Sequence, residues 1–251
     1  MKILSLAPSV TETMFALGAE SCLVGVTSLC DYPLEARNLP RIGGWIDAKP
    51  QLLDKIEFDV AIGSMFVSQN VIAYCEEKDK QLVTLNPRVL ADVFQDIIQI
   101  GELVDKNQEA RAIVGQMKNV FNAVNAKPKS GLRVYVEEWS TPPMASGNWV
   151  PELVQFVGGI SFCQSGKLSQ AFLLNDLKVF DPQVIILSIC GAGDKKSPTE
   201  VKQRVDWREL SAVKNNNIFV IEDSLLNRPS PRLARGAEKL WEIFSTISPI
   251  V

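Results

Sequence analysis

The amino-acid sequence predicts an α/β fold with two three-layer α/β lobes, each built on a mainly parallel sheet, joined by one long backbone helix. Short apolar strands alternate with helical segments through the first 88 residues, and the alternation resumes after residue 128. Between these halves lies a run of helical periodicity without a proline. Alternating strands and helices are typical of parallel sheets covered by helices. We therefore expect lobes at 1–88 and 128–251 and a linking helix at 89–127.

The N-terminal lobe is predicted to start with a strand at 3–7, followed by a helix that stops at Gly18. Ser9 and Glu12 have the spacing of a capping box, in which each side chain bonds the backbone N–H of the other residue. We therefore expect this pair to open the helix. Further strands are expected at 22–26, 58–63 and 81–85, with a helix at 67–78.

Residues 90–125 carry apolar side chains at the spacing of one helical face, including Val93, Ile97, Ile100 and Val104. This periodicity predicts an amphipathic helix. No proline interrupts the run, and the segment AKPKSG at 126–131 ends it. The pattern therefore predicts a single helix that links the two lobes.

The C-terminal lobe repeats the alternation. Strands are expected at 133–137, 184–189 and 218–222, and helices at 151–157 and 231–246. Gly158 and Gly159 close the first of these helices. Trp207 and Trp241 fall at the start of a predicted helix and inside the last one, so we assign both to the hydrophobic core.

The composition excludes several classes of function. Twenty-six basic residues stand against 29 acidic ones, and no basic run indicates nucleic-acid binding. The chain has no histidine, which is the commonest side-chain general base and metal ligand. We therefore expect no histidine-based catalysis and no histidine-built metal site.

The cysteines indicate reduced thiols. They are odd in number, widely spaced and contain no CxxC pair: Cys22, Cys30, Cys75, Cys163 and Cys190. Neither a disulfide framework nor a zinc site is expected from this spacing.

No segment approaches the roughly 18 apolar residues that a membrane span needs, so no membrane insertion is expected. The N-terminal apolar run stops at Pro8 and is too short for a signal-peptide core. On the sequence as given we expect a cytoplasmic protein, or a periplasmic or other extracytoplasmic one if a leader was trimmed.

The segment VEEWSTPPMASGNWVPEL at 136–153 follows a predicted strand and sets two tryptophans among prolines and small polar residues. Successive strand side chains point to opposite faces, so only one of Glu137 and Glu138 can face a binding site. We assign Glu138 to the site and Glu137 to a solvated or structural role. Trp139 and Trp149 either cover a flat, largely apolar ligand or pack this loop against the core.

Six motifs together carry a family resemblance: SLAPSVTETMFALGA at 5–19, GVTSLCDYP at 25–33, RIGGW at 41–45, the tryptophan-rich segment at 136–159, FDPQVIILSICGAG at 180–193 and EDSLLNRPSPRL at 222–233. They resemble the helical-backbone substrate-binding proteins of ABC importers, and most of all the vitamin B12-binding branch. The resemblance implies a monomer whose two rigid lobes hold a ligand in the cleft between them, on loops after the carboxyl ends of strands. It also implies a corrinoid, a large cobalamin-like metal chelate, as the ligand, with no catalytic cofactor.

Two more aromatic residues are candidates within this resemblance. Trp45 follows two glycines, and the resemblance implies that an aromatic at this point contacts the corrin face; the alternative is that Trp45 packs against the protein. Phe66 follows the strand at 58–63, and the same argument applies to it more weakly. Asp31 and Tyr32 either hydrogen-bond the ligand or form a turn.

The remaining candidates are two thiols and one cation. Cys30 and Cys190 follow apolar runs in different lobes, so they either face the ligand as soft-metal ligands or are buried as small apolar residues. Arg228 either donates to a phosphate, propionate or amide of the ligand or pairs with Asp223 or Glu222.

The resemblance further implies docking to an ABC permease through one exposed acidic residue in each lobe. The corresponding positions are Gln51 and Asn175, and neither is acidic. Asp54 and Asp176 lie close by and would take this role if the alignment shifts. A permease partner and a soluble carrier therefore both stay open.

We expect a binding protein rather than an enzyme, with a corrinoid as ligand and a ferric siderophore or haem as the alternative. An enzyme would have to use Glu138 with Cys30 or Cys190 on a small molecule. The segment GAGDKKS at 191–197 resembles a phosphate-binding loop only superficially, because it lacks the GK[ST] ending in register.

Overall fold

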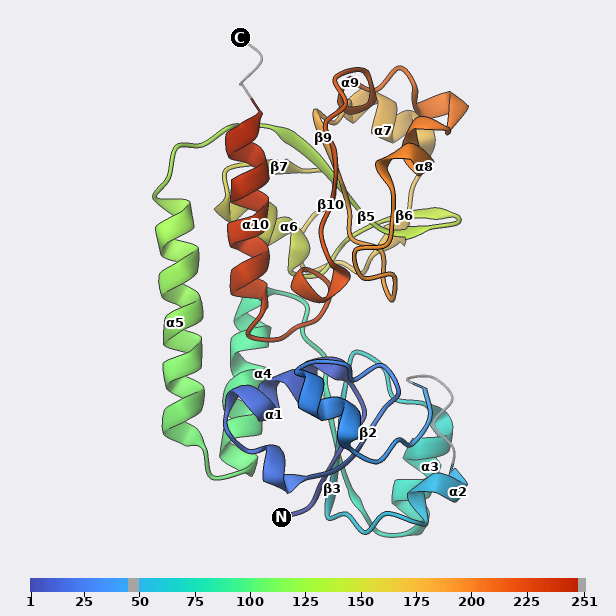
Figure 1. The fold of residues 1–251 in the computed structure, drawn as a ribbon, viewed down its shortest axis with the longest axis vertical. Helices are drawn as coiled ribbons and strands as arrows, with labels where there is room; N and C mark the ends of the chain where they lie inside the picture. The colour runs from blue at the N-terminus through green and yellow to red at the C-terminus, as the bar shows by residue number, and fades with distance from the viewer. Residues whose placement is uncertain (45–49, 248–251) are drawn as a thin grey trace. The chain divides into compact units, whose positions relative to one another are not determined.

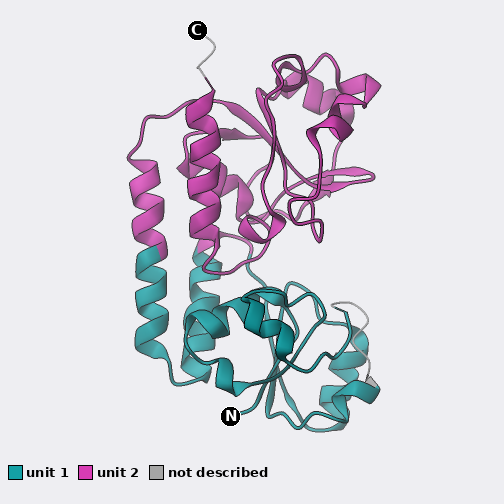
Figure 2. Ribbon diagram, in the orientation of Figure 1, with its two compact units in different colours: residues 1–87, 91–116 teal, residues 88–90, 117–251 magenta. Residues whose placement is uncertain are grey.

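A computed structural model describes residues 1–44 and 50–247, and its elements confirm two α/β lobes with mainly parallel sheets (Figure 1). The chain divides into two compact units (Figure 2). Unit 1 comprises residues 1–87 and 91–116, and unit 2 comprises residues 88–90 and 117–251. Each unit has its own sheet and its own hydrophobic core.

Unit 1 is built on a four-stranded parallel sheet in the order β2-β1-β3-β4. Its strands are β1 (Ile3–Ser5), β2 (Leu23–Val26), β3 (Val60–Ser64) and β4 (Gln81–Leu85). Its shorter helices are α1 (Pro8–Ala16), α2 (Pro50–Leu53) and α3 (Gln69–Glu77), with 3₁₀ turns at Glu20–Cys22 and Leu34–Asn38. Because all four strands are parallel, the loops that follow them emerge at one edge of the sheet.

The first helix does not begin with the predicted capping box. Pro8 occupies the first helical turn and Ala7 is the N-cap, with no side-chain cap hydrogen bond. Proline suits this position because its missing N–H would have no helical partner there. Ser9 and Glu12 are instead buried inside the helix. The stop at Gly18 is confirmed, since this glycine has a φ of +65° directly after the C-cap.

The predicted single helix over 89–127 is two helices, α4 (Leu90–Leu103) and α5 (Asn107–Asn125). Asp105 adopts a positive φ of 57° between them, and the N–H of Lys106 donates to the carbonyl of Gly101 at 2.7 Å. This is the left-handed ending that terminates many helices. Unbroken periodicity and the absence of proline therefore did not prevent a break. The chain passes from one unit to the other within each of these helices (Figure 2).

Unit 2 is built on a six-stranded mixed sheet in the order β10-β9-β5-β6-β8, with β7 also paired to β5. Its strands are β5 (Arg133–Ser140), β6 (Pro143–Ala145), β7 (Ile160–Ser161), β8 (Gln170–Ala171), β9 (Val184–Leu187) and β10 (Ile218–Val220). Its helices are α6 (Val150–Phe156), α7 (Leu174–Phe180), α8 (Pro198–Lys202), α9 (Ser211–Lys214) and α10 (Leu233–Thr246), with 3₁₀ turns at Val205–Trp207 and Asp223–Leu225. Strands β7, β9 and β10 run parallel to β5, whereas β6 runs antiparallel to it.

The first part of the tryptophan-rich segment, up to Ala145, is a β-hairpin rather than a loop, and its last part is the start of α6. Strand β5 continues past Glu137 to Ser140, and β6 returns beside it. The register shifts between Glu137 and Trp139, so one extra residue of β5, Glu138, lies opposite β6. Such a bulge interrupts the strict alternation of side chains and re-aims them.

An aromatic cluster centres on Tyr135 in the core of unit 2. Its ring makes edge-to-face contacts with Phe162, Phe172 and Trp207, at centroid distances of 5.9, 5.3 and 5.6 Å. The assignment of Trp207 to the core is confirmed, since it is 5% exposed. Trp241 is half-buried on α10, and the ammonium of Lys127 lies 3.4 Å from its ring centroid.

Candidate functional site

Two predicted aromatic residues are exposed in unit 1, on segments that follow strands. Tyr32 lies after β2 and is 47% exposed, and Phe66 lies just after β3 and is 42% exposed. Met65 has a positive φ of 66°, so the chain turns sharply as it leaves β3. Aromatic rings carry a large apolar surface. Their exposure at the carboxyl edge of the sheet therefore suits contact with a flat apolar partner.

The thiol of Cys30 is enclosed in unit 1. Cys30 is 0% exposed, its Sγ lies 3.2 Å from the hydroxyl of Thr27, and burial raises the pKa of the thiol. Arg41 fixes this loop from within by donating to the backbone oxygens of Thr27 and Cys30 at 2.7 and 2.9 Å. The prediction that Cys30 contacts a ligand is therefore wrong, and its alternative as a small buried apolar residue holds.

The other candidates of unit 1 stay predictions. Asp31 is exposed, and its backbone oxygen accepts a hydrogen bond from Arg37 at 3.3 Å. Trp45 lies outside the described residues, so its expected contact with a corrin face is not addressed by the structure.

Trp139 is the exposed aromatic residue of the β5–β6 hairpin in unit 2. It pairs with Met144 across the hairpin and is 48% exposed. Its indole N–H donates to the carbonyl of Thr141 at 3.0 Å. Because the N–H is satisfied within the hairpin, the ring offers its apolar surface to a partner.

Trp149 belongs to the interior of unit 2. It is 2% exposed, and its indole N–H donates to the carbonyl of Leu226 at 2.7 Å. It is the N-cap residue of α6 and follows Asn148, which has a positive φ of 51°. The prediction of a ligand contact for Trp149 is therefore corrected, and the packing alternative holds.

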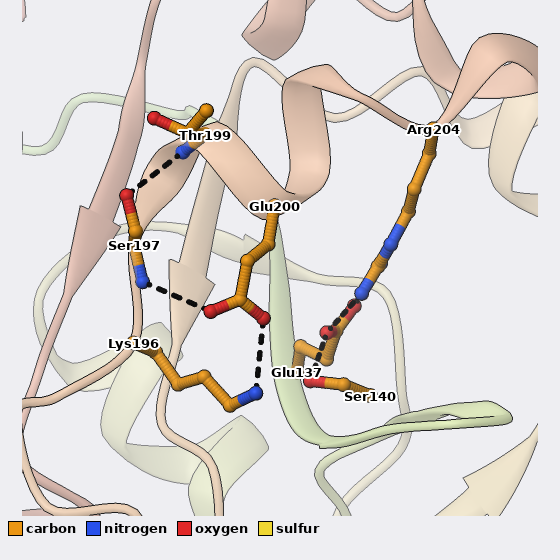
Figure 3. Close-up of polar contacts among 7 residues, drawn as sticks. All are labelled: Glu137, Ser140, Lys196, Ser197, Thr199, Glu200 and Arg204. Atoms are coloured by element: carbon orange, nitrogen blue, oxygen red, sulfur yellow. Dashed lines mark hydrogen bonds and ion pairs between the residues drawn. The ribbon is translucent and has the colours of Figure 1, made fainter.

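Glu137 is fully buried in a bidentate ion pair with Arg204 (Figure 3). The guanidinium donates to the two carboxylate oxygens at 2.6 and 2.8 Å, and the hydroxyls of Tyr135 and Ser140 each donate at 3.1 Å. Arg204 also lies over Trp207, 4.4 Å from the ring centroid. A buried carboxylate needs such a set of partners. The structural role expected for Glu137 is thus the correct one, and the solvated role is wrong.

Sequence reasoning missed Arg204. It lies between α8 and a 3₁₀ turn in VKQRVDW, where nothing local separates it from an ordinary surface cation. Just before it, Ser197 and Glu200 form a capping box at the start of α8, with Lys196 paired to Glu200 at 2.9 Å (Figure 3). The segment from 196 to 204 is therefore fixed at its start by a cap and at its end by the Glu137 ion pair.

Glu138 has no such partner. Its carboxylate accepts hydrogen bonds from the hydroxyl of Ser169 and from the thiol of Cys190, the latter at 3.6 Å. Burial raises the pKa of this carboxyl, and the two hydrogen bonds lower it by less. Within residues 1–44 and 50–247, no lysine or arginine forms an ion pair with it.

Cys190 lies beside Glu138 and is half-buried. Burial, together with the charges of Glu138 and Asp223, raises the pKa of its thiol well above the ordinary value. The amide nitrogen of Asn227 donates to its Sγ at 3.5 Å. A protonated thiol is a poor nucleophile and a poor metal ligand. Cys190 is thus a hydrogen-bonding neighbour of Glu138, and its contact with a ligand stays a prediction.

The glycine-rich segment after β9 does not bind phosphate through its backbone. The N–H groups of Gly191 and Gly193 donate to the two carboxylate oxygens of Asp223 at 3.0 and 2.9 Å. Both glycines have positive φ, which turns these N–H groups toward one acceptor. An internal carboxylate already fills the place that an external anion would need.

Arg228 is half-buried on the segment that follows the 3₁₀ turn at Asp223–Leu225. The side chain of Glu222 pairs with Arg232 at 3.4 Å, and Asp223 accepts the two glycine N–H groups. Contact of Arg228 with a ligand stays a prediction.

The positions expected for docking acids are all on the surface. Gln51 and Asn175 are exposed, and so are the neighbouring Asp54 and Asp176. Tyr74 donates to Asp54 at 3.1 Å. A cavity of about 450 Å³ opens in unit 2 beside Asp176, lined mainly by residues between 162 and 173, and it contains none of the predicted ligand-binding residues.

The described part of the chain contains no group of three or more cysteine, aspartate or glutamate residues placed to hold a metal ion. Over the same residues, no helix is long and apolar enough to cross a membrane. The two units have exposed aromatic rings at or after strand ends, and in unit 2 the Glu138 carboxylate has no cationic partner among the described residues. Exposed rings and a carboxylate of this kind can contact and hydrogen-bond a bound molecule.

A family model described as periplasmic binding protein matches residues 3–225. An uncharacterised ABC transporter substrate-binding lipoprotein of Bacillus subtilis is 26% identical over 259 residues, covering 96% of this chain and 79% of the relative. A vitamin B12-binding protein of Vibrio parahaemolyticus is 23% identical over 255 residues, covering 98% of this chain and 90% of the relative.

Among solved structures, a periplasmic haem-binding protein of Vibrio cholerae has a TM-score of 0.84 and is 20% identical. The match covers 97% of this chain and 98% of that one. A likeness at this identity concerns the fold and leaves the ligand open.

Proposed function

We propose that this chain, which belongs to the periplasmic binding protein family, binds a corrinoid as the solute-binding component of an ABC importer. The family consists of binding proteins, so capture of a solute without chemical conversion is the expected activity. The corrinoid is the finer part of the proposal. It is supported by the vitamin B12-binding relative, which matches nearly the whole chain.

The observation that carries the proposal is the exposure of three aromatic side chains at or just beyond strand ends. Tyr32 and Phe66 in unit 1 and Trp139 in unit 2 are between 42% and 48% exposed. They are the three aromatic residues among the exposed large hydrophobic side chains of the described chain. A corrin is a broad ring system that stacks well on such surfaces. The family resemblance implies that residues of both lobes contact one ligand, and this stays part of the proposal.

The absence of histidine narrows how a corrinoid would bind. No imidazole of this chain can replace the axial base of the cobalt. The ligand would therefore keep its own axial groups, and recognition would rest on ring contacts and hydrogen bonds.

Haem and ferric siderophores are the alternative ligands. Haem is an alternative because a solved haem-binding protein has a similar fold, and because a porphyrin would stack on the same aromatic rings. An enzyme based on Glu138 with Cys30 or Cys190 has less support, because one thiol is enclosed and the other has a raised pKa.

The expected partner is an ABC permease, with Asp54 and Asp176 as candidate docking residues. The expectation of a cytoplasmic protein gains no support from the relatives, one of which is a lipoprotein and another periplasmic. We therefore propose an extracytoplasmic location.

Calorimetric titration with cyanocobalamin tests this proposal. We expect saturable one-to-one binding that weakens by about tenfold in Trp139→Ala and in Phe66→Ala, because each variant loses one aromatic contact and its buried area. The control is Leu173→Ala, which removes an apolar side chain of unit 2 that is 73% exposed. Its affinity should stay within about twofold. Equal affinity of all four proteins for cyanocobalamin would contradict the proposal that these aromatic side chains bind it.

A further inference from the structure

Two adjacent glutamates of β5 have opposite electrostatic environments. Glu137 has Arg204 across two charge-assisted hydrogen bonds. Among the residues that the structure describes, Glu138 accepts hydrogen bonds from two neutral groups, the hydroxyl of Ser169 and the thiol of Cys190. Among the described residues, the first of these carboxylates therefore has a cationic partner and the second has none.

The hydrogen-bond donors around Glu138 are already in use. The Ser169 hydroxyl donates to Glu138 and accepts from the N–H of Gly147 at 2.9 Å. The amide nitrogen of Asn227 donates to the carbonyl of Ser188 at 2.6 Å and to Cys190 at 3.5 Å. The amide oxygen of Asn227 is buried and has no donor among the described residues. Among the described residues around Glu138, the Ser169 and Asn227 donors are thus engaged, and the Asn227 amide oxygen is an acceptor without a donor.

A carboxylate can accept about four hydrogen bonds, and the described part of the chain gives Glu138 two. A partly buried carboxylate without a cation is costly, and this cost explains the direction of its pKa. The cost is lowered by an N–H donor brought by a bound molecule, and it is raised by a second carboxylate at the same place.

The position of Glu138 suits contact with a molecule held by the hairpin. It precedes the exposed Trp139, and it is the extra residue of the bulge opposite β6. Because the bulge interrupts strict alternation, the two side chains are not forced to opposite faces of the sheet. The side chain is also half-buried rather than enclosed.

We propose that Glu138 is the residue that selects the ligand by charge, favouring a chelate whose periphery carries amide N–H groups and disfavouring one that carries carboxylates. This inference rests on the proposed function and decides between its ligands. The periphery of cobalamin carries primary amides, whereas haem carries two propionates. Glu138 therefore selects the corrinoid against haem through unfavourable charge contact as well as through hydrogen bonding.

The test compares cyanocobalamin with its separated monocarboxylic acid derivatives, in each of which one peripheral amide is replaced by a carboxylate. Dissociation constants are measured for the wild type, for Glu138→Gln and for the control Glu209→Gln. Glu209 is an exposed glutamate of the same unit whose side chain is 81% exposed. All three proteins are first compared by thermal melting, and Glu138→Gln should be at least as stable as the wild type because it no longer buries a charge.

We expect the wild type and Glu209→Gln to bind at least one of the derivatives about tenfold more weakly than cyanocobalamin. In Glu138→Gln this difference should shrink to about threefold or less, since a neutral amide neither repels a carboxylate nor requires a donor. If all derivatives bind the wild type as well as cyanocobalamin does, or if Glu138→Gln keeps the full difference, the proposal is overturned.

A haem titration of the same proteins separates this inference from the proposed function. Wild-type protein that binds haem as tightly as cyanocobalamin would overturn the charge selection while leaving corrinoid binding intact. Haem binding that appears or tightens about tenfold only in Glu138→Gln, without any corrinoid binding, would overturn the proposed function and support the charge selection. Binding of neither ligand would overturn both.

Discussion

At the scale of single residues, the ion pair between Glu137 and Arg204 joins a fully buried carboxylate to a guanidinium through two hydrogen bonds in unit 2. The carboxylate is fully buried, and the guanidinium side chain is 20% exposed. Both are further held by neighbours, Glu137 by Tyr135 and Ser140 and Arg204 by the ring of Trp207. The pair joins β5 to the segment that follows α8.

Arg204→Ala should destabilise the protein by about 3–5 kcal/mol, because it leaves a buried carboxylate without its cation. Urea unfolding followed by circular dichroism measures the loss. The matched control is Arg208→Ala, which removes an exposed arginine four residues later and should cost less than about 1 kcal/mol. A similar loss of unfolding free energy in the two variants would contradict the predicted contribution of the ion pair to stability.

A second carboxyl group with an altered environment is that of Asp96 on α4. Burial and the nearby charge of Asp92 raise the pKa of its carboxyl from 3.8 to about 7, and its Oδ2 is buried without a hydrogen-bond partner among the described residues. Because the folded-state pKa is raised, the folded protein binds more protons than the unfolded chain between pH 4 and 7. Stability therefore falls as the pH rises through this window.

Asp96→Asn should remove this dependence. At pH 8 the free energy of unfolding of the variant should exceed that of the wild type by about 1–2 kcal/mol, a value reduced for the partial exposure of the side chain. At pH 5 the two free energies should differ little. Thermal melts at the two pH values provide the measurement, with Glu102→Gln, an exposed glutamate of the same helix, as control. Parallel pH profiles for wild type and Asp96→Asn would contradict the raised pKa.

At the scale of elements, the sequence predicted those whose pattern is local. Strand β4 was expected at its observed bounds, and β1, β3 and β9 within two residues, because buried parallel strands are short apolar runs. Strands β7 and β8 are each only two residues long, and each depends on the strand that it pairs with, β5 for β7 and β6 for β8. They therefore carry no periodicity that could predict them.

The break between α4 and α5 had a different cause. Asp105 in a left-handed conformation ends α4, and Gly101 lets the start of α5 approach. A Cβ at Gly101 would lie 2.5 Å from the Cβ of Ala110 and 3.0 Å from the backbone oxygen of Lys106. Such a close approach between two segments is not visible in a periodicity argument.

Gly101→Ala should lower stability by about 1–2 kcal/mol, because overpacking at Ala110 and Lys106 outweighs the helix propensity of alanine. Gly115→Ala on α5 is the matched control, since a Cβ there would meet nothing within 4 Å. That control should raise stability by about 0.5–1 kcal/mol. Denaturant unfolding measures the free energy of unfolding of both variants. A Gly101→Ala variant more stable than the wild type would contradict the close approach at Gly101.

At the scale of the whole molecule, the family resemblance read from six sequence motifs is confirmed by a family model that spans residues 3–225. The site was only partly predictable. Tyr32, Phe66 and Trp139 are exposed, and their contact with a ligand stays a prediction, whereas Cys30 and Trp149 are enclosed. Position after a strand is visible in the sequence. Burial is decided by partners far along the chain, such as the carbonyl of Leu226 for Trp149, and these are not visible there.

The central proposal is that the exposed aromatic rings bind a corrinoid rather than another metal chelate. Its most direct test is a pair of calorimetric titrations of the purified chain, one with cyanocobalamin and one with haem. We predict saturable one-to-one binding of cyanocobalamin and binding of haem at least about tenfold weaker. Saturable binding of haem with no heat from cyanocobalamin would contradict the claim.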